Sequence, residues 1–252
     1  MDKSKIRESY ESVRKRVIHL QDTILYKCLL KISNMQKGYF IAFEGIDGSG
    51  KTDQVTRLFQ HLRRALPKRS ILVTREPYDG EEIEKMQKED PEAYSNGTRM
   101  TELYVVDRQN HADLLIAPVT SAGGIVLCDR YALSTYAYQV AQGVDFNKIR
   151  NMHIHRGIPN PDLTLFLDID VEIAEQRVRL RGEPLEKFER DREFIIKVIA
   201  EYRRLFKLAR QPRPRLYLEH FGSIQRIDGN APKDQVASEI RYLIDNLIGL
   251  PR

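Results

Sequence analysis

The residues Tyr39-Phe40-Ile41-Ala42-Phe43-Glu44-Gly45-Ile46-Asp47-Gly48-Ser49-Gly50-Lys51-Thr52 combine an apolar run with the spacing Gly45, four residues, Gly50-Lys51-Thr52. This spacing is typical of a P-loop, in which backbone N–H groups hold the phosphates of a nucleotide. The glycines allow backbone conformations that a side chain would forbid, so successive N–H groups turn inward. A helix that starts directly after the loop adds its positive N-terminal dipole. The stretch therefore predicts a nucleotide-binding site.

The sequence around the loop strengthens this prediction. The alternative is a glycine-rich strand-to-helix turn that binds no nucleotide and matches so short a pattern by chance. Here an apolar strand precedes the loop, and a helical spacing follows it at Gln54, Val55, Leu58, Phe59 and Leu62. In this setting Lys51 is expected to reach the β- and γ-phosphates, and the Thr52 hydroxyl to bind Mg²⁺.

Composition places the chain among soluble globular proteins. Its 252 residues are 31% charged and 41% hydrophobic, and no apolar run approaches the roughly 20 residues that span a bilayer. The net charge of +5 fits a nucleic-acid partner, a site for polyanionic small molecules, or solubility alone. The only cysteines are Cys28 and Cys128, without zinc-ligand spacing or a secretory signal before them, so a reducing cytoplasm is expected.

Residues 1–36 are predicted to form a helical extension that precedes the main domain of residues 37–252. Apolar residues recur there at steps of four and three, which is typical of one stripe along a helix: Ile6, Tyr10, Val13, Val17, Leu20 and Ile24. Packing on the chain's own domain is the favoured role for this stripe. A dimer-forming or partner-binding helix is the alternative.

The rest of the chain alternates short apolar strands with helices. The later strands are predicted at 70–74, 124–129, 161–168 and 224–227, and the helices at 81–89, 100–117 (ending before Pro118), 131–142, 171–210 (with a break) and 236–248. Strands that are apolar throughout indicate a parallel sheet covered on both faces. The predicted fold class is therefore α/β: a three-layer P-loop NTPase fold with a mostly parallel five-stranded sheet.

Charged residues follow several of these strands, and we expect them to meet at one edge of the sheet. They are Asp47 in the loop, Arg75-Glu76, Asp129-Arg130, and Asp168 with Asp170. The carboxyl ends of parallel strands form the usual binding edge of such sheets. Asp129 ends a buried strand, where P-loop proteins place a carboxylate that organises Mg²⁺, although a helix cap or an ion pair with Arg130 would also explain it.

Arginines are numerous where a phosphate acceptor would need them. Moving a phosphoryl group onto another phosphate brings two anions together, so positive charge beyond Lys51 is expected. Arg75 and Arg108 are candidates for the acceptor phosphate. A cluster flanks the Gly-Pro break between two helical segments, which favours a mobile lid at about 178–192, although interleaved acids also fit a solvated surface: Arg177, Arg179, Arg181, Arg190 and Arg192.

Five separated motifs resemble those of the thymidylate kinase family, which are nucleoside monophosphate kinases of the P-loop class. They are Phe43 to Thr52; Thr74-Arg75-Glu76-Pro77; Asp107-Arg108 with His111; Asp129-Arg130-Tyr131 followed by Ser134 and Ala137-Tyr138-Gln139; and Pro161 to Thr164 with Leu167-Asp168. Their order and approximate spacing also agree. The resemblance covers about residues 38–248.

The resemblance implies transfer of the ATP γ-phosphate to dTMP, giving dTDP, with Mg²⁺, in a homodimer without a stable nucleic-acid partner. It assigns ATP binding to Gly45, Ile46, Asp47, Gly48, Ser49, Gly50, Lys51, Thr52 and Arg177. It assigns acceptor binding to Asp47, Arg75, Arg108, Arg130, Ser134, Thr135, Tyr138 and Gln139. Lys51, Asp47, Arg75 and Arg181 are the implied catalytic residues, and Thr52 and Asp129 the implied metal ligands.

The chain departs from the family pattern in three places. Asp53 follows the P-loop threonine where a second threonine is usual, residues 78–84 lack the usual Gly-rich segment and Ile-Arg pair, and residues 1–34 have no counterpart. The second region supplies the aromatic that stacks on thymine in the family, and no residue here is assigned that role. Two alternatives therefore stay open: a kinase for another deoxynucleotide or a deoxynucleoside, and a non-catalytic nucleotide-binding or regulatory protein.

Overall fold

The computed structural model describes residues 36–89, 96–180, 182, 191–211 and 221–250. The chain divides into two units, residues 1–37 and 38–252, and the contacts reported below belong to the second. The predicted N-terminal helix lies outside the described residues, as does most of the predicted lid. Both remain predictions.

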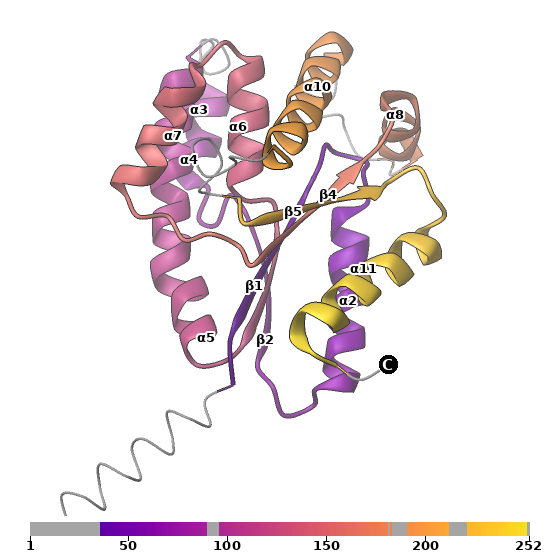
Figure 1. The fold of residues 1–252 in the computed structure, drawn as a ribbon. Coiled ribbons are helices and arrows are strands. Elements are labelled where there is room, and N and C mark those ends of the chain that lie inside the picture. Colours follow the sequence, from indigo (N-terminus) through magenta and orange to yellow (C-terminus); the bar gives the residue numbers. More distant parts are fainter. Residues whose placement is uncertain (1–35, 90–95, 181, 183–190, 212–220, 251–252) are drawn as a thin grey trace, which may run out of the picture. The chain divides into compact units, whose positions relative to one another are not determined.

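Five parallel strands form the centre of the second unit, as the sequence predicted (Figure 1). They are β1 (Tyr39–Glu44), β2 (Ile71–Arg75), β3 (Ile125–Asp129), β4 (Leu163–Asp168) and β5 (Ser223–Asp228). Their order across the sheet is β2-β3-β1-β4-β5, and every neighbouring pair is parallel. The strand that leads into the P-loop is therefore the middle one.

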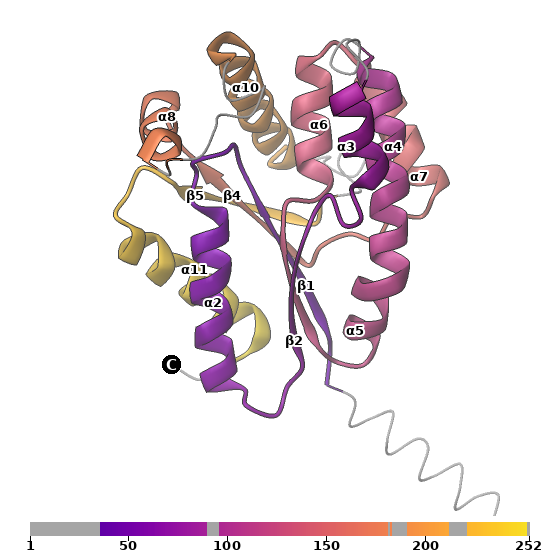
Figure 2. The ribbon, with the colours of Figure 1, turned by 180° about the vertical axis from the view of Figure 1, so that it is seen from behind.

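Helices cover both faces of this sheet (Figures 1 and 2). On one face lie α2 (Lys51–Ala65) and α11 (Lys233–Ile248). The larger layer on the other face includes α4 (Gly97–His111), α6 (Ala132–Ala141) and α10 (Arg192–Ala209). The remaining helical segments are α3 (Glu81–Glu89), η1 (Ala112–Ile116), α5 (Ala117–Ser121), α7 (Phe146–His155) and α8 (Val171–Leu180).

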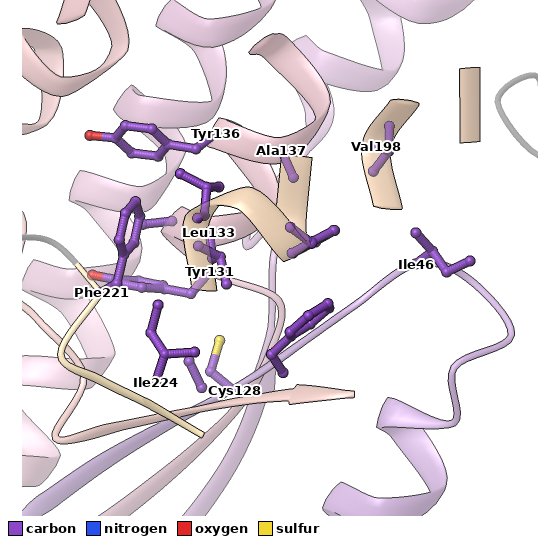
Figure 3. Packing of buried hydrophobic residues seen from close by; sticks show 14 of the residues in the cluster. Ile46, Cys128, Tyr131, Leu133, Tyr136, Ala137, Val198, Phe221 and Ile224 are labelled. Carbon is purple, nitrogen blue, oxygen red and sulfur yellow. The ribbon is translucent and has the colours of Figure 1, made fainter. Parts of the chain in front are cut away.

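Alternation along the strands divides the core into two clusters. In β1, Ile41 and Phe43 join the cluster under α2 and α11, whereas Phe40 and Ala42 join the cluster under α6 and α10. Successive strand residues point to opposite faces, so a strand buried on both faces is apolar throughout. Aromatic rings, among them Tyr131, Tyr136 and Phe221, lie in the cluster under α6 and α10 (Figure 3). Phe40 and Tyr131 meet edge to face with centroids 4.8 Å apart.

The helical layer departs from the predictions at two points. The long helix was expected to end before Pro118, but helical structure continues to Ser121. The wide π-helical turn η1 comes first, and Pro118 then lies in the first turn of α5, where a missing N–H is tolerated. Helix α7 was not predicted; Asp145 caps its start by accepting a hydrogen bond from Lys148 N at 2.9 Å.

The strand register aligns the charged strand ends. Phe43 of β1 and Arg75 of β2 both pair with Asp129 of β3, and Asp168 pairs with Asp228. The residues that follow these strands are thus brought to one edge of the sheet. In the described part of the chain, no helix is long and apolar enough to cross a membrane.

Candidate active site

The P-loop of residues 45–52 turns sharply between β1 and α2. Gly48 and Gly50 have φ angles of 80° and 94°, in the left-handed region. Gly48 also packs on α8, because a Cβ at this position would lie 2.5 Å from the carbonyl oxygen of Ala174. Gly50 is the N-cap of α2 and provides no side chain to cap it. The first N–H groups of α2 are therefore left for an anion.

Lys51 is the first residue of α2, and its ammonium group lies inside the loop. Its Nζ donates to the carbonyl oxygens of Gly45 and Ile46, each at 3.0 Å, and lies 4.0 Å from Asp47 Oδ1. Burial lowers the pKa of Lys51 below its ordinary value, and the nearby Arg130 guanidinium acts in the same direction. The negative charge of bound phosphate would oppose both effects and raise the pKa of Lys51.

Thr52 and Asp129 form a pair of oxygen ligands at the mouth of the loop. The Thr52 hydroxyl donates to Asp129 Oδ2 at 2.6 Å, although the two residues belong to α2 and β3. Among the residues described, no cluster of three or more His, Cys, Asp or Glu side chains could hold a metal alone. Mg²⁺ commonly takes one or two protein oxygens and completes its shell with phosphates and water. The Thr52–Asp129 pair fits that requirement.

Arg130 follows β3 and turns back toward the loop. Its φ of 70° is unusual for a side chain other than glycine. The conformation is held because its N–H donates to Phe43 O at 2.8 Å and its carbonyl accepts from the Cys128 thiol. The guanidinium donates to Asp47 Oδ1 at 2.5 Å and to Ser134 Oγ at 3.3 Å. Arg130 thus joins the P-loop to α6.

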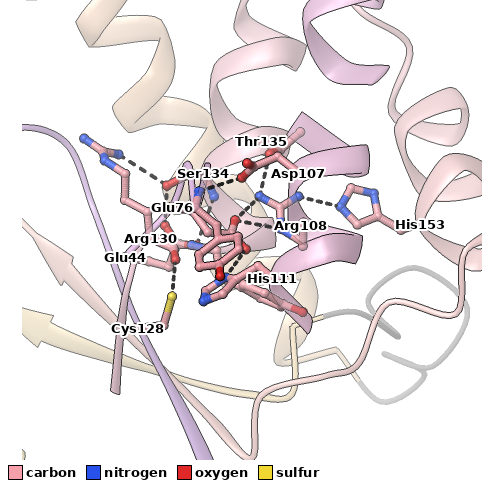
Figure 4. A network of polar contacts seen from close by, with 12 residues as sticks. Glu44, Glu76, Asp107, Arg108, His111, Cys128, Arg130, Ser134, Thr135 and His153 are labelled. Atoms are coloured by element: carbon pink, nitrogen blue, oxygen red, sulfur yellow. Dashed lines mark hydrogen bonds and ion pairs between the residues drawn. The ribbon is translucent and has the colours of Figure 1, made fainter. Parts of the chain in front are cut away.

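Glu44, the last residue of β1, has no role that the sequence predicts. Its fully buried carboxylate accepts from Ser134 N and Ser134 Oγ (Figure 4). It also accepts from Tyr131 N and from the Tyr202 hydroxyl of α10 at 3.1 Å. Burial raises its pKa, which the hydrogen bond from the Ser134 hydroxyl partly opposes. Glu44 therefore connects the central strand with α6 and α10.

Arg108 of α4 is at the centre of a second buried network, which includes Glu76, Thr135 and His153 (Figure 4). Its Nε and Nη2 donate to Glu76 Oε2 at 2.9 and 2.6 Å, and Nη2 also donates to Thr135 Oγ1. The third side of the guanidinium meets His153 Nε2 at 2.9 Å. Only 1% of Arg108 is exposed. The motif Arg75-Glu76 thus divides, with Glu76 neutralising Arg108 and Arg75 remaining exposed.

Asp107, the residue before Arg108 in α4, binds the segment that follows β2 a few residues beyond Glu76. Its carboxylate accepts from the backbone N–H groups of Tyr78, Asp79 and Gly80, at 2.7, 2.9 and 3.2 Å. This turn stands where the family pattern has a Gly-rich segment. The side chain of Tyr78 stacks on His111, with ring centroids 4.9 Å apart.

The predicted acceptor-binding residues of α6 occupy different environments. The Ser134 hydroxyl donates to Glu44 Oε2 at 2.6 Å, and the ring of Tyr138 lies beside the Arg130 guanidinium. Thr135 is buried against Arg108. Gln139 is also buried, and its amide donates to Gln142 at 3.2 Å. Arg130, Ser134 and Tyr138 are therefore brought together next to the loop, whereas Gln139 points to the end of its own helix.

The predicted lid is only partly visible. Arg177, near the end of α8, has its Nη1 3.5 Å from the Gly48 carbonyl oxygen, so this arginine does reach the P-loop. Arg181 lies outside the described residues. The carboxylates of Asp168 and Asp170, which were expected at the same edge, accept hydrogen bonds from Arg203 of α10.

A P-loop after the central strand, with a threonine–carboxylate pair and arginines at the same sheet edge, defines a phosphotransferase of the P-loop nucleotide kinase class. The family model for thymidylate kinase matches residues 43–240. The chain belongs to the thymidylate kinase family.

Individual relatives agree over most of the chain. A thymidylate kinase of Desulfotalea psychrophila is 34% identical over 214 residues, which cover 82% of this chain and 96% of the relative. A probable thymidylate kinase of Pyrococcus horikoshii is 36% identical over 180 residues, which cover 68% of this chain and 84% of the relative. A thymidylate kinase of Trichodesmium erythraeum is 34% identical, and the match covers 82% of this chain and 95% of the relative.

Proposed function

We propose that this chain transfers the γ-phosphate of ATP to dTMP, giving dTDP and ADP, with Mg²⁺ as cofactor. The observation that carries the proposal is the meeting of Lys51 and Arg130 on the Asp47 carboxylate, at 4.0 and 2.5 Å. Lys51 belongs to the P-loop, the proposed ATP site, and Arg130 precedes α6, which carries Ser134 and Tyr138. Positive charge from two separate strand ends thus surrounds one point, as transfer between two phosphates requires.

On the donor side, the triphosphate would lie along residues 45–52 with Lys51 at its β- and γ-phosphates. Thr52 and Asp129 would hold Mg²⁺, which neutralises the developing charge when bound. Arg177 already reaches the loop at Gly48. The role of Arg181 is proposed from the family resemblance alone.

On the acceptor side, Arg75 and Arg130 are best placed for the dTMP phosphate. Arg75 is exposed beside Asp129 in the register of the sheet, and within the described residues no hydrogen bond or ion pair occupies its guanidinium. A guanidinium fork suits phosphate oxygens. Asp47, which holds Arg130, would lie near the acceptor sugar, as the family resemblance implies.

The contacts of Arg108 support a role at the base rather than at the phosphate. Its charge is balanced by Glu76, and it lies against Thr135, one residue further along α6 than Ser134. A fixed, neutralised donor suits a carbonyl oxygen of thymine better than a dianion. Tyr104 precedes Arg108 by one turn of α4 and is partly buried. Burial is the main cause that raises the pKa of Tyr138, and the nearby Tyr104 phenol adds to it. We propose Tyr104 as the aromatic that stacks on the base.

A coupled ADP-release assay over a panel of nucleoside monophosphates, with thymidine included, tests this function. We expect dTMP to be the preferred acceptor and Lys51→Ala to abolish turnover. Turnover with thymidine but not dTMP would identify a nucleoside kinase instead. Turnover that survives Lys51→Ala would place the chemistry at another site, and salt-dependent DNA binding without turnover would favour the non-catalytic alternative.

We also propose a cytoplasmic homodimer. The outer side of α4 and η1 exposes Val106 at 38% and Leu114 at 64%, two turns apart on nearly continuous helix. Exposed apolar residues along one helix are typical of an interface between subunits.

A further inference from the structure

His153 of α7 lies against Arg108 and is fully buried. Its Nε2 is 2.9 Å from Arg108 Nη1, and its Nδ1 is 2.9 Å from the carbonyl oxygen of Ile149, four residues earlier in the same helix. The ring of Tyr136 packs against the imidazole with centroids 5.1 Å apart. No sequence motif singled out this histidine.

The two contacts fix the protonation of the imidazole. A backbone carbonyl only accepts and a guanidinium only donates, so Nδ1 must carry the proton and Nε2 must accept from Arg108. His153 is therefore neutral in this arrangement, with a defined tautomer. It serves Arg108 as a directional acceptor without competing for its charge.

Arg108 needs such an acceptor, because its ion pair alone does not fix its orientation. Both Nε and Nη2 donate to the same oxygen, Oε2 of Glu76, while Oε1 of Glu76 is used by His111 at 3.1 Å. Two hydrogen bonds to one oxygen atom would still let the guanidinium rotate about that atom. The hydrogen bonds of Nη2 with Thr135 and of Nη1 with His153 restrict this rotation. Four of the five N–H donors are then used, which leaves one on Nη1.

We propose that His153 is a positioning residue for acceptor recognition: it holds Arg108 so that the remaining Nη1 N–H meets the base of the nucleoside monophosphate. This inference rests on the proposed function, in which Arg108 contacts the acceptor. It adds that α7, through one neutral imidazole, determines how tightly the acceptor is bound and leaves the ATP site unaffected.

Two substitutions separate this role from simple packing. His153→Gln places an amide oxygen near the position of Nε2 and keeps the acceptor for Arg108. The shorter side chain in His153→Asn places its amide near the position of Nδ1, where the NH₂ group can donate to the Ile149 carbonyl, and leaves Arg108 without this acceptor. We expect His153→Asn to raise the KM for dTMP by about 10- to 100-fold, as the loss of one charge-assisted hydrogen bond predicts. The KM for ATP should stay within about twofold, and His153→Gln should restore the dTMP value to within about threefold.

His155 provides the matched control. It is exposed on the same helix, and its Nδ1 meets the Asn151 carbonyl in the same way, at 2.6 Å. His155→Asn should therefore leave both KM values unchanged. If the Asn and Gln variants of His153 behave alike, or if the KM values for dTMP and ATP rise together, the positioning role is wrong. The proposed function would survive that result as long as the unchanged chain and the His155 variant still phosphorylate dTMP.

A second measurement does not depend on the Asn variant folding. In the ¹⁵N-histidine spectrum of the unchanged chain, assigned with His153→Gln, we expect the neutral Nδ1–H tautomer for His153. Its Nε2 resonance should shift on addition of dTMP but not of ADP. An Nε2–H tautomer, or a resonance indifferent to dTMP, would overturn the proposal.

Discussion

Asp47 Oδ1 lies 2.5 Å from Arg130 Nη2, and this contact joins the P-loop to the start of α6. The two residues follow different strands and are 83 positions apart in the sequence. The same Asp47 oxygen lies 4.0 Å from Lys51 Nζ. One carboxylate oxygen therefore stands between a cation of the donor site and a cation of the proposed acceptor site.

Asp47→Asn should lower kcat by about 100-fold, because the two cations lose the charge that holds them together. The KM values for ATP and dTMP should change less, and steady-state kinetics with each substrate varied will show this. Asp53→Asn is the control, since Asp53 lies in the first turn of α2 and pairs with Arg57 at 2.8 Å. Equal losses in both variants would contradict a special role for Asp47.

Gly48→Ala should weaken ATP binding severely, because its Cβ would lie 2.5 Å from the Ala174 carbonyl oxygen and its φ is 80°. Titration with a fluorescent ATP analogue measures this effect. Gly143→Ala is matched, since Gly143 has a φ of 90° but open space around its Cβ position. It should cost only about 1 kcal/mol of stability. Normal nucleotide affinity in Gly48→Ala would show that the loop does not need its contact with α8.

Arg108→Ala should lower the free energy of unfolding by about 3–5 kcal/mol, because the buried carboxylate of Glu76 would lose its arginine partner. It should also raise the KM for dTMP and lower kcat, with ATP binding nearly unchanged. Arg75→Ala should affect the dTMP kinetics but cost less than about 1 kcal/mol of stability, since Arg75 is exposed. Urea denaturation distinguishes the two; similar stability losses would mean that the Arg108–Glu76 pair contributes no more than a surface residue.

As the pH is raised, activity should be lost with a midpoint that lies below 10.5, the ordinary pKa of a lysine. Burial lowers the pKa of Lys51, so its ammonium loses the proton, and its attraction for phosphate, earlier as the pH rises. The profile of kcat/KM for ATP reports the free enzyme and is the measurement of choice. Lys51→Arg keeps its charge throughout this range, so its residual activity should lack that limb. A limb that persists in Lys51→Arg would belong to another group.

Leu114→Glu should dissociate the proposed homodimer, because it introduces a charge into the apolar side of α4 and η1. Light scattering of the purified chain measures the mass. Ile196→Glu is the control, since Ile196 is exposed at 43% on a different helix, α10. A monomeric parent chain, or a dimer that survives Leu114→Glu, would exclude this interface.

The strands and the loop were predictable from the sequence because their signals are local. A strand buried on both faces is apolar throughout, and the P-loop spacing lies within eight residues. The partners of buried polar groups could not be predicted. Glu44 finds its donors 87 and 158 residues further along the chain, and nothing near Glu76 indicates that it neutralises Arg108. Helix α7 was missed because its apolar pattern is weak, although Asp145 was an available capping signal.

Adjacent residues on a helix project about 100° apart. Asp107 and Arg108 grip the connection after β2 in two such directions, one through three backbone N–H groups and the other through Glu76. Rotation of α4 about its own axis, in either direction, would weaken one of these two sets of hydrogen bonds. The two sets therefore fix the rotation of the helix, and a compound that bound between α4 and this connection would have to break both.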